Sequence, residues 1–508
     1  MGNEHSVNKN LKLIAKSSFI VLIGIAISKI LVYIYRVIIA RQFGPDMYGI
    51  FSLASMVVSW FAAFFAFGLN EGILRYVSIF RGKKDARKIR YVFGISSSIM
   101  LVSSIIGGIL LFLLSGFISA QIFHNTEIAV FLRAFSILVP LTILSGTYLS
   151  LMRAYEMIGW HSFIFNIAQN VLKVFILILL VIMGIKSSSP IIASYLLGIF
   201  GMLIMSYLVA RYKIPGVFAG NKTADKLTSK NRILSELAHY SFPIMFTGIF
   251  SIIFYWLDSF AIGYFRSVAE VGYYNAAAPI AMLLLLAPEL FMQLFFPLIA
   301  KEYYKRNYST IKELSKQVGK WIFTINLPIF LLIILFPGTL INILFGKEYL
   351  LASNALKILS IGMIFAVLYA VNIDFFLGIG KPEINNLIVY SAALFNLAAN
   401  IIMIPIWGII GAAISTTISY FIMMLIGLIK IRKFIKIKFP AKTWAKTAIA
   451  GIIFVFIILF LKWILALNAW IEAVVVLSIA GLAYLALLFL LKIVSINELK
   501  IIYGRILR

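Results

Sequence analysis

The chain has 508 residues, of which 62% are hydrophobic, and a mean hydropathy of +1.03. Soluble domains contain roughly 45–50% apolar residues, so this composition excludes one large soluble core and predicts an all-α polytopic membrane protein. The absence of cysteine excludes disulfides and thiolate metal sites, and the four histidines show no metal-ligand spacing. The net charge of +27 falls mostly in alternate loops, so we expect anionic membrane lipids, and not nucleic acid, as the surface partner.

Fourteen apolar runs, separated by polar loops, are long enough to cross a bilayer as helices. The first run follows Lys9, Lys12 and Lys16 and precedes no small-residue cleavage site, so we interpret it as a retained helix and not as a signal peptide. The spans are expected at about 17–40, 48–80, 91–117, 128–154, 160–184, 190–211, 239–264, 272–300, 321–345, 353–378, 384–404, 408–430, 446–465 and 470–492.

The loops between the spans predict orientation and argue against catalysis. Lys and Arg gather after the even-numbered spans, more weakly after the fourth and tenth. By the positive-inside rule, we expect both termini in the cytoplasm and a multi-pass protein of the cell (cytoplasmic) membrane. The outer loops are only a few residues long, and the chain has no paired carboxylates, His-metal spacing or Gly-rich phosphate loop. An enzyme such as a polysaccharide polymerase or a glycosyltransferase is therefore not expected.

A weak internal repeat divides the chain. Three pairs of segments match at offsets of 221–223 residues: 46–51 with 269–274, Phe123 with Phe345, and 157–160 with 378–381. Because this offset spans six helices, an even number, we expect two parallel six-helix repeats related by an axis along the membrane normal. Transporters built in this way bind substrate between the repeats and alternate access by rocking. The predicted segments are an N-terminal six-helix lobe, a C-terminal six-helix lobe and two final helices: 1–225, 226–435 and 436–508.

Several motifs carry a resemblance to a known family: Ala40–Gly49 after the first span, Phe345–Tyr349 before the tenth, Gly378–Pro382 entering the eleventh, and Asn396–Asn400 and Ile404–Ala413 at the link to the twelfth. Through them the chain resembles polysaccharide flippases of the multidrug/oligosaccharidyl-lipid/polysaccharide exporter superfamily. The resemblance implies a V-shaped two-lobe transporter, with 14 transmembrane helices here. Its implied cargo is a polyprenyl-(pyro)phosphate-linked oligosaccharide, flipped to the outer leaflet by alternating access for surface polysaccharide or glycan assembly. By analogy with the lipid II flippase branch, the last two helices would hold the lipid tail. We expect a monomer.

Basic residues lie inside the predicted spans of the first half. A charge near the middle of a membrane helix costs about 2.5–3.5 kcal/mol, so such residues are not expected to face lipid. Lys29 and Arg36 are seven residues apart and share one helix face. We predict that Lys29, Arg36, Arg75 and Lys173 line a water-filled cavity, where Arg forks and Lys charges suit an anionic pyrophosphate. The alternative is that some of them form interhelical ion pairs or snorkel to the interface.

Other side chains in the spans have less specific interpretations. Glu71 lies four residues before Arg75 and can pair with it on one helix face. Arg133 and Arg153 lie near span ends, where snorkelling is expected. Trp256 could stack on a sugar ring, although packing or an aromatic belt is the more common role of such a residue.

In the second half the charges inside the spans are mostly acidic: Asp258, Glu289 and Asp374. The lipid II flippase branch has a sodium site in this half, and the resemblance implies that Asp258, Asn396, Asn400 and Thr416 stand at its positions. Asn400 replaces an acid that the branch can carry there, which lowers the charge of the site. The alternative is an asparagine ladder that binds neighbouring helices. Asp374 is the other coupling candidate, as a proton carrier. No cofactor is expected beyond Na⁺ or H⁺ as a possible coupling ion.

The alternative function within transport is a cation-coupled multidrug or organic-cation antiporter, because the same superfamily includes such proteins. A basic cavity disfavours a cationic cargo, since like charges would face each other in a low dielectric. We therefore predict the flippase.

Overall fold

The computed structural model describes residues 2–185, 187–218, 230–434, 440–464 and 469–495. Side chains are described within these ranges except at 2–23, 290, 292–297, 300, 371–374, 377–378 and 469–474. The described residues are almost entirely helical and contain no strand. The chain divides into two compact units, Met1–Gly272 and Tyr273–Arg508. These two units divide the chain by its contacts, whereas the three predicted segments (1–225, 226–435 and 436–508) divide it by its sequence. The three segments therefore remain a prediction.

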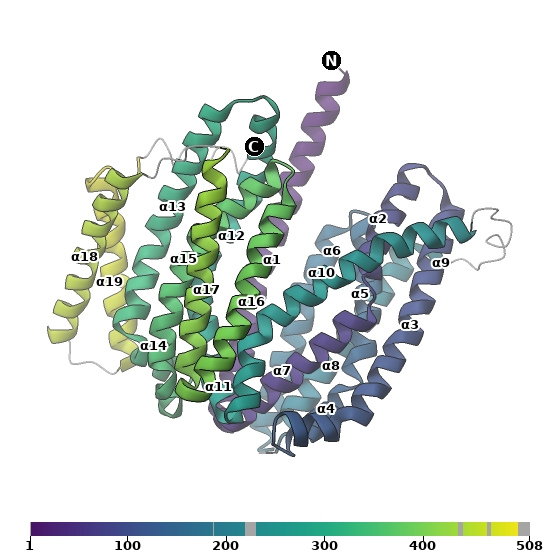
Figure 1. The fold of residues 1–508 in the computed structure, drawn as a ribbon, viewed down its shortest axis with the longest axis horizontal. Helices are drawn as coiled ribbons and strands as arrows, with labels where there is room; N and C mark the ends of the chain where they lie inside the picture. Colours follow the sequence, from purple (N-terminus) through teal and green to yellow (C-terminus); the bar gives the residue numbers. More distant parts are fainter. Residues whose placement is uncertain (1, 186, 219–229, 435–439, 465–468, 496–508) are drawn as a thin grey trace. The chain divides into compact units, whose positions relative to one another are not determined.

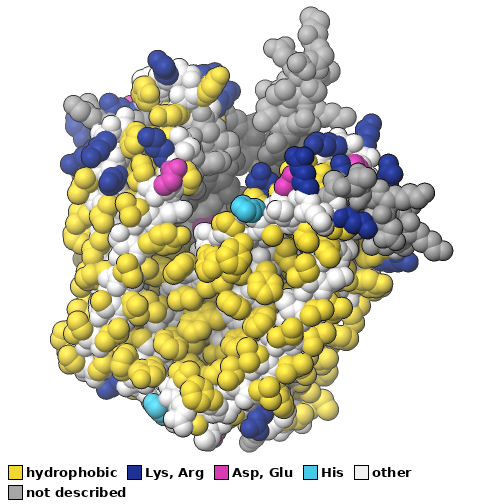
Figure 2. All heavy atoms as spheres, turned by 45° about the vertical axis from the view of Figure 1, so that its right-hand side comes forward, with side chains coloured by type: hydrophobic (Ala, Val, Ile, Leu, Met, Phe, Trp, Pro, Cys, Tyr) yellow, Lys and Arg dark blue, Asp and Glu magenta, His cyan; other side chains and the backbone are white. Residues whose placement is uncertain are grey.

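Twelve helices in the described part of the chain are long and apolar enough to cross a membrane, and Val475–Leu490 is a shorter apolar helix. Figure 2 shows the surface that results on one face: hydrophobic side chains cover most of the flank, and Lys and Arg side chains gather near its ends. An apolar flank between charged ends is the surface that a bilayer requires. The protein is therefore a multi-pass membrane protein, and the count of fourteen spans remains a prediction.

The first unit contains ten complete helices and the start of an eleventh within its described residues (Figure 1). They are α1 (Gly2–Phe65), α2 (Leu69–Gly82), α3 (Ala86–Phe117), α4 (Ile128–Phe135), α5 (Leu138–Ala154), α6 (Ile158–Ser162), α7 (Gln169–Ile182), α8 (Ser189–Lys213), α9 (Pro215–Phe218), α10 (Lys230–Phe265) and α11 (Val268–Met282). Short π-helical turns, Ile118–Ile122 and Phe163–Ala168, extend α3 and join α6 to α7. The core forms where α7 packs along α8 and α3 along α5.

The opening of the chain differs from the two spans predicted at 17–40 and 48–80. Helix α1 continues through the expected loop and only kinks there, at Gly44, whose φ of 79° is left-handed. Pro45 follows, at a position where a helix can restart without its N–H. The predicted second span is broken instead at Phe67 (φ 49°) and Gly68 (φ 66°), so that α2 begins as a separate helix.

Two glycines allow α2 to approach α10 closely. A Cβ at Gly68 would lie 2.3 Å from the Ser241 carbonyl oxygen, and one at Gly72 would lie 2.4 Å from the Ser241 Oγ. Gly68 and Gly72 are four residues apart, the spacing that lets membrane helices cross at short distance. The break in the predicted span therefore serves a close helix crossing.

Two helical turns that match in the predicted repeat, 45–49 and 268–272, touch each other within the first unit. A Cβ at Gly49 would lie 2.0 Å from the Val268 carbonyl oxygen, and a Cβ at Gly272 would lie 2.2 Å from the Pro45 carbonyl oxygen. Pro45 and Val268 stand at the same offset as Gly49 and Gly272. The contact is therefore reciprocal: each glycine packs against the carbonyl that begins the other turn.

The described residues of the second unit form two packed groups (Figure 1). Its elements after α11 are α12 (Leu286–Tyr304), α13 (Tyr308–Leu335), α14 (Pro337–Leu344), α15 (Ser353–Gly378), α16 (Pro382–Trp407), α17 (Ile409–Arg432), α18 (Ala441–Ile464) and α19 (Ala469–Leu490), with 3₁₀ turns at Leu283–Leu285 and Lys347–Ala352. Helix α17 packs against both α15 and α16. The pair α18 and α19 packs on α13, where the Tyr484 hydroxyl donates to the Thr324 carbonyl oxygen at 2.9 Å.

Candidate substrate cavity

Arg36 and Lys173 line one cavity of about 110 Å³ inside the first unit. Helix α1 supplies Arg36, and helix α7 supplies Lys173, which is only 7% exposed. Aromatic side chains form much of the remaining wall: Tyr35, Phe51, Tyr195 and Trp256. The structure thus brings together two of the four basic residues predicted to bind substrate, and it places Trp256 beside them.

The ammonium group of Lys173 faces an aromatic ring. Its Nζ lies 4.2 Å from the ring centroid of Tyr195, within the range of a cation–π interaction. Among the described residues, no carboxylate lies within ion-pair distance of this ammonium. The lysine is therefore a buried cation without a neutralising charge beside it.

Arg36 is partly buried, and phenol groups provide its contacts. Its guanidinium donates hydrogen bonds to the hydroxyls of Tyr48 on α1 and Tyr255 on α10. Within the described part of the chain it forms no ion pair with a carboxylate. The phenol partners of both basic groups in the cavity are thus neutral.

Polar contacts fix the helices that carry this wall. The Asn170 Nδ2 on α7 donates to the Ser28 Oγ on α1 at 3.1 Å. The Tyr35 hydroxyl and the Ser194 Oγ are hydrogen-bonded at 2.9 Å, which joins α1 to α8. These bonds hold α1, α7 and α8 in register around the cavity.

The structure does not place Lys29 and Arg75 among the residues that line this cavity. Lys29 is partly buried on α1. Arg75 is exposed on α2, and its guanidinium carbon lies 4.2 Å from the ring centroid of Tyr240. A role of these two residues in substrate binding remains a prediction.

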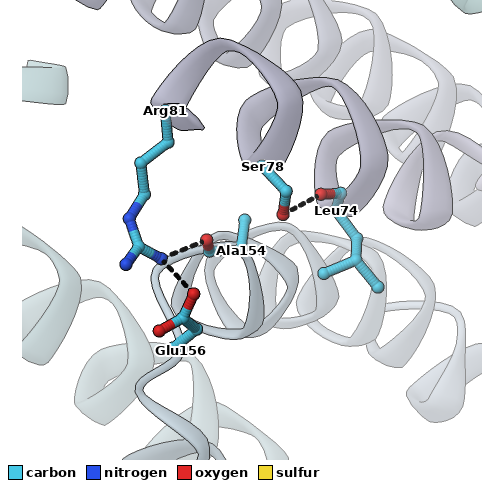
Figure 3. Close-up of polar contacts among 5 residues, drawn as sticks. All are labelled: Leu74, Ser78, Arg81, Ala154 and Glu156. Carbon is cyan, nitrogen blue, oxygen red and sulfur yellow. Dashed lines mark hydrogen bonds and ion pairs between the residues drawn. The ribbon is translucent and has the colours of Figure 1, made fainter. Parts of the chain in front are cut away.

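The predicted contact of Glu71 with Arg75 is replaced by another ion pair. Glu71 Oε1 lies 3.0 Å from Arg153 Nη1, so these side chains tie α2 to α5. A second arginine strengthens the same junction (Figure 3): Arg81 Nη1 donates to the Ala154 carbonyl oxygen at 2.9 Å and lies 3.3 Å from Glu156 Oε1. Arg153 is therefore engaged with a carboxylate. Arg133 is exposed, and its Nε donates to the Ser115 Oγ at 3.4 Å.

Three of the four residues predicted for a sodium site meet between α16 and α17. Asn396 Nδ2 donates to Ser415 Oγ and to Thr416 Oγ1, each at 3.1 Å. Asn400 Nδ2 donates to Asn396 Oδ1 at 3.1 Å, and the Ser415 hydroxyl donates to Asn400 Oδ1. Asn396 and Asn400 are 2% and 0% exposed. The Ser415 and Thr416 oxygens accept bonds from an amide, as in the alternative prediction of an asparagine ladder that joins neighbouring helices.

The acidic candidates lie on other helices, α10, α15 and α12. Asp258 is partly buried on α10 in the first unit, whereas Asn396, Asn400 and Thr416 belong to the second. The side chain of Asp374 lies outside the described residues, and Glu289 is exposed on α12. The ion-coupling role of Asp258, Asp374 and the asparagines remains a prediction.

Sequence reasoning missed Tyr35, Phe51 and Tyr195 as cavity residues. From the sequence alone, a tyrosine in an apolar span can equally well pack in the core or belong to an aromatic belt. Only the contact between helices shows that the ring of Tyr195 faces Lys173. A usable signal was Lys173 itself, because a buried ammonium needs a partner on a neighbouring helix.

Known proteins resemble this chain in sequence and in fold. The sequence profile of the family described as "Polysaccharide biosynthesis protein" matches residues 14–303, and the MatE profile matches 243–402. An uncharacterized membrane protein of Methanocaldococcus jannaschii is 28% identical over 501 residues, which cover 94% of this chain and 95% of that protein. A "Putative O-antigen transporter" of Shigella flexneri is 25% identical over 419 residues, which cover 80% of this chain and 94% of that protein.

A solved structure, lipid II flippase MurJ in an inward closed conformation, matches with a TM-score of 0.70 at 17% identity, covering 96% of this chain and 100% of that one. This match shows a shared fold. Because the first profile covers more than half of the 508 residues, the chain belongs to the family of polysaccharide biosynthesis proteins, within the multidrug/oligosaccharidyl-lipid/polysaccharide exporter superfamily.

Proposed function

We propose that the protein flips a polyprenyl-(pyro)phosphate-linked oligosaccharide across the cytoplasmic membrane by alternating access, for surface polysaccharide or glycan assembly. One observation carries the proposal: Arg36 and Lys173 share a cavity and are held there by phenol groups instead of carboxylates. An anionic phosphate group would supply the missing negative charge. The names of two similar proteins, an O-antigen transporter and a lipid II flippase, support a cargo of this class.

The composition of the wall fits a glycosylated lipid headgroup. The cavity volume of about 110 Å³ suits the phosphate part of such a headgroup and not a whole oligosaccharide. Tyr35, Tyr195 and Trp256 offer ring faces, which commonly pack against sugar rings as well as against cations. We therefore propose that the phosphate binds in this cavity, with the first sugar at its mouth. Lys29 and Arg75 are proposed to guide the headgroup toward it.

The reciprocal contact of Gly49 with Val268 and of Gly272 with Pro45 supports the rocking part of the proposal. A symmetric contact without intervening side chains can close tightly and separate without rearranging side chains. We propose that it opens and closes as the two repeats rock. Coupling to Na⁺ or H⁺, a monomeric state and cytoplasmic termini complete the proposal.

A multidrug or organic-cation antiporter is the second candidate, favoured by the MatE profile match at 243–402. The charge of the cavity argues against it. Two like charges at 4 Å repel by about 4 kcal/mol at an effective dielectric constant of 20, so a cationic drug beside Lys173 would bind poorly.

The test is to neutralise the cavity. In a strain that depends on this protein for a surface glycan, the Arg36→Gln/Lys173→Gln double variant should abolish export while it still inserts into the membrane. The matched control is Arg133→Gln, which removes an exposed arginine outside the cavity and should leave export unchanged. Normal export by the double variant, at a membrane level equal to the wild type, would contradict the proposal.

A further inference from the structure

Tyr195 has a fixed position among other rings. Its ring stacks on Phe135 with centroids 5.4 Å apart and meets Phe51 edge-on, also at 5.4 Å. Phe135 is fully buried, so the stack has no room to turn. The preceding residue, Ser194, bonds to Tyr35 and anchors this turn of α8. The face of Tyr195 toward Lys173 is therefore set before any ligand arrives.

The next turn of α8 holds the stem of the same lysine. A Cβ at Gly198 would lie 2.3 Å from the Lys173 Cγ and 3.3 Å from its Cε. Gly198 follows Tyr195 by three residues, so both lie on one face of α8. Helix α8 thus supplies a slot for the aliphatic stem and an aromatic face for the ammonium group.

Resting on the proposed function, we infer that Tyr195 is the positioning residue that holds Lys173 charged and ready for the phosphate of the lipid carrier. Burial of an ammonium without a partner is costly, and the ring offsets part of this cost. A carboxylate would offset more of it, but the incoming phosphate would then have to displace that carboxylate. The ring stabilises the cation and leaves the anion site open.

The competing interpretation is that Tyr195 only fills the core. Removing a core ring would weaken folding but would not act through one lysine. The two interpretations therefore differ in a double-mutant cycle, where a residue that acts through Lys173 loses its effect once Lys173 is gone.

The experiment measures binding of geranylgeranyl diphosphate to the full-length protein in detergent, with inorganic pyrophosphate as a second probe for the free anion. Tyr195→Leu should weaken the affinity for the lipid probe about 3- to 30-fold, while Tyr195→Phe, which keeps the ring, should stay close to wild type. In the Lys173→Gln background, Tyr195→Leu should have no further effect. If only pyrophosphate responded in this way, the site would recognise the free anion and the inference would fail for the lipid carrier.

A second series keeps the shape of the side chain, in case Tyr195→Leu does not fold. Phenylalanines of increasing fluorination at position 195 weaken the negative ring face, so the affinity should fall with each step. The inference would be overturned if Tyr195→Leu weakened binding equally in the wild-type and the Lys173→Gln backgrounds. It would also be overturned if fluorination left the affinity unchanged. Either result would leave the proposed function standing. No binding of either probe by the wild-type protein would overturn the proposed function together with the inference.

Discussion

Two polar regions inside this protein differ in the partners of their polar side chains. In the cavity of the first unit, Arg36 and Lys173 face phenol groups and no carboxylate of the described residues. Between α16 and α17, Asn396 and Asn400 are neutral and bond to each other and to neighbouring hydroxyls. A buried polar group that finds its partners within the fold stabilises the fold. A basic group inside the fold whose partners are neutral, with no carboxylate beside it, is a functional-site candidate, and this contrast separates the two regions.

Placing a carboxylate in the cavity should have the largest effect. Ser55 lines the cavity, and Ser55→Asp would give Arg36 and Lys173 an internal counterion. The diphosphate of the ligand would lose an attraction to these basic groups of about 4 kcal/mol at 4 Å and an effective dielectric constant of 20. This corresponds to a loss of about a thousandfold in affinity for geranylgeranyl diphosphate. Titration calorimetry measures this loss. Ser55→Asn, of the same size and without charge, is the control; an equal loss in both variants would contradict the charge argument.

The glycine contact between the helical turns 45–49 and 268–272 should show the next largest effect. Gly49→Ala and Gly272→Ala each place a Cβ near 2 Å from a carbonyl oxygen, so the turns must separate. Overpacking of this kind costs about 1–3 kcal/mol. Because the chain has no cysteine, a single Ser52→Cys in the cavity can report access by maleimide labelling.

The labelling rate should change in both alanine variants. Gly116→Ala, where nothing lies within 4 Å of the added Cβ, should label like the parent protein. Unchanged labelling in all three variants would argue against a role of this contact in opening the cavity.

The asparagine cluster should affect stability and not affinity. Asn400→Leu would leave Ser415 and Asn396 Oδ1 without the bonds that Asn400 provides, at a cost of about 1–3 kcal/mol. The unfolding temperature in detergent should fall, while binding of geranylgeranyl diphosphate stays unchanged. Ser391→Ala, an exposed serine on the same helix, is the control. Sodium-dependent transport that Asn400→Leu abolishes without loss of stability would show that the cluster is an ion site and not an asparagine ladder.

The smallest effect is expected outside both regions, at the start of α3. Burial of Asp85 opposes its ionisation, but the backbone N–H and the ammonium of Lys88 outweigh this and lower its pKa. A lowered carboxyl pKa stabilises the fold above the unfolded-state pKa, and this contribution is lost as the pH falls through the lower folded-state value. Asp85→Ala should cost about 1 kcal/mol at neutral pH and less in acid. Thermal unfolding at several pH values measures this, and a cost independent of pH would contradict it.

The sequence predicts the charged half of the cavity well and its aromatic half poorly. Arg36 and Lys173 are recognisable because charges inside apolar spans need a reason. Asn396 and Asn400 are recognisable as neighbours because they stand four apart on one helix. Tyr195 is not recognisable, because its role depends on which face of α8 meets α7, and no residue pattern encodes that pairing. Arg75 fits the same pattern of a charge inside an apolar span, and no residue pattern indicates its contact with the Tyr240 ring.

The helix boundaries show the same limit. The motif around Gly44 and Pro45 indicates a loop, yet neighbouring packing keeps the helix running through a kink. The break at Phe67 and Gly68 is hidden inside a continuous apolar run, since hydrophobicity alone does not reveal a left-handed turn. Its signal is the spacing of Gly68 and Gly72, which fits a close crossing of two helices.

The central claim is that the cavity is built for an anion, and transport of two opposite cargoes by the purified protein in liposomes tests it most directly. A fluorescent polyprenyl-pyrophosphate oligosaccharide should be moved across the bilayer, and the Arg36→Gln/Lys173→Gln variant should not move it. An organic cation such as ethidium should not be transported by the wild-type protein. Movement of the cation and not of the anionic lipid would contradict the account.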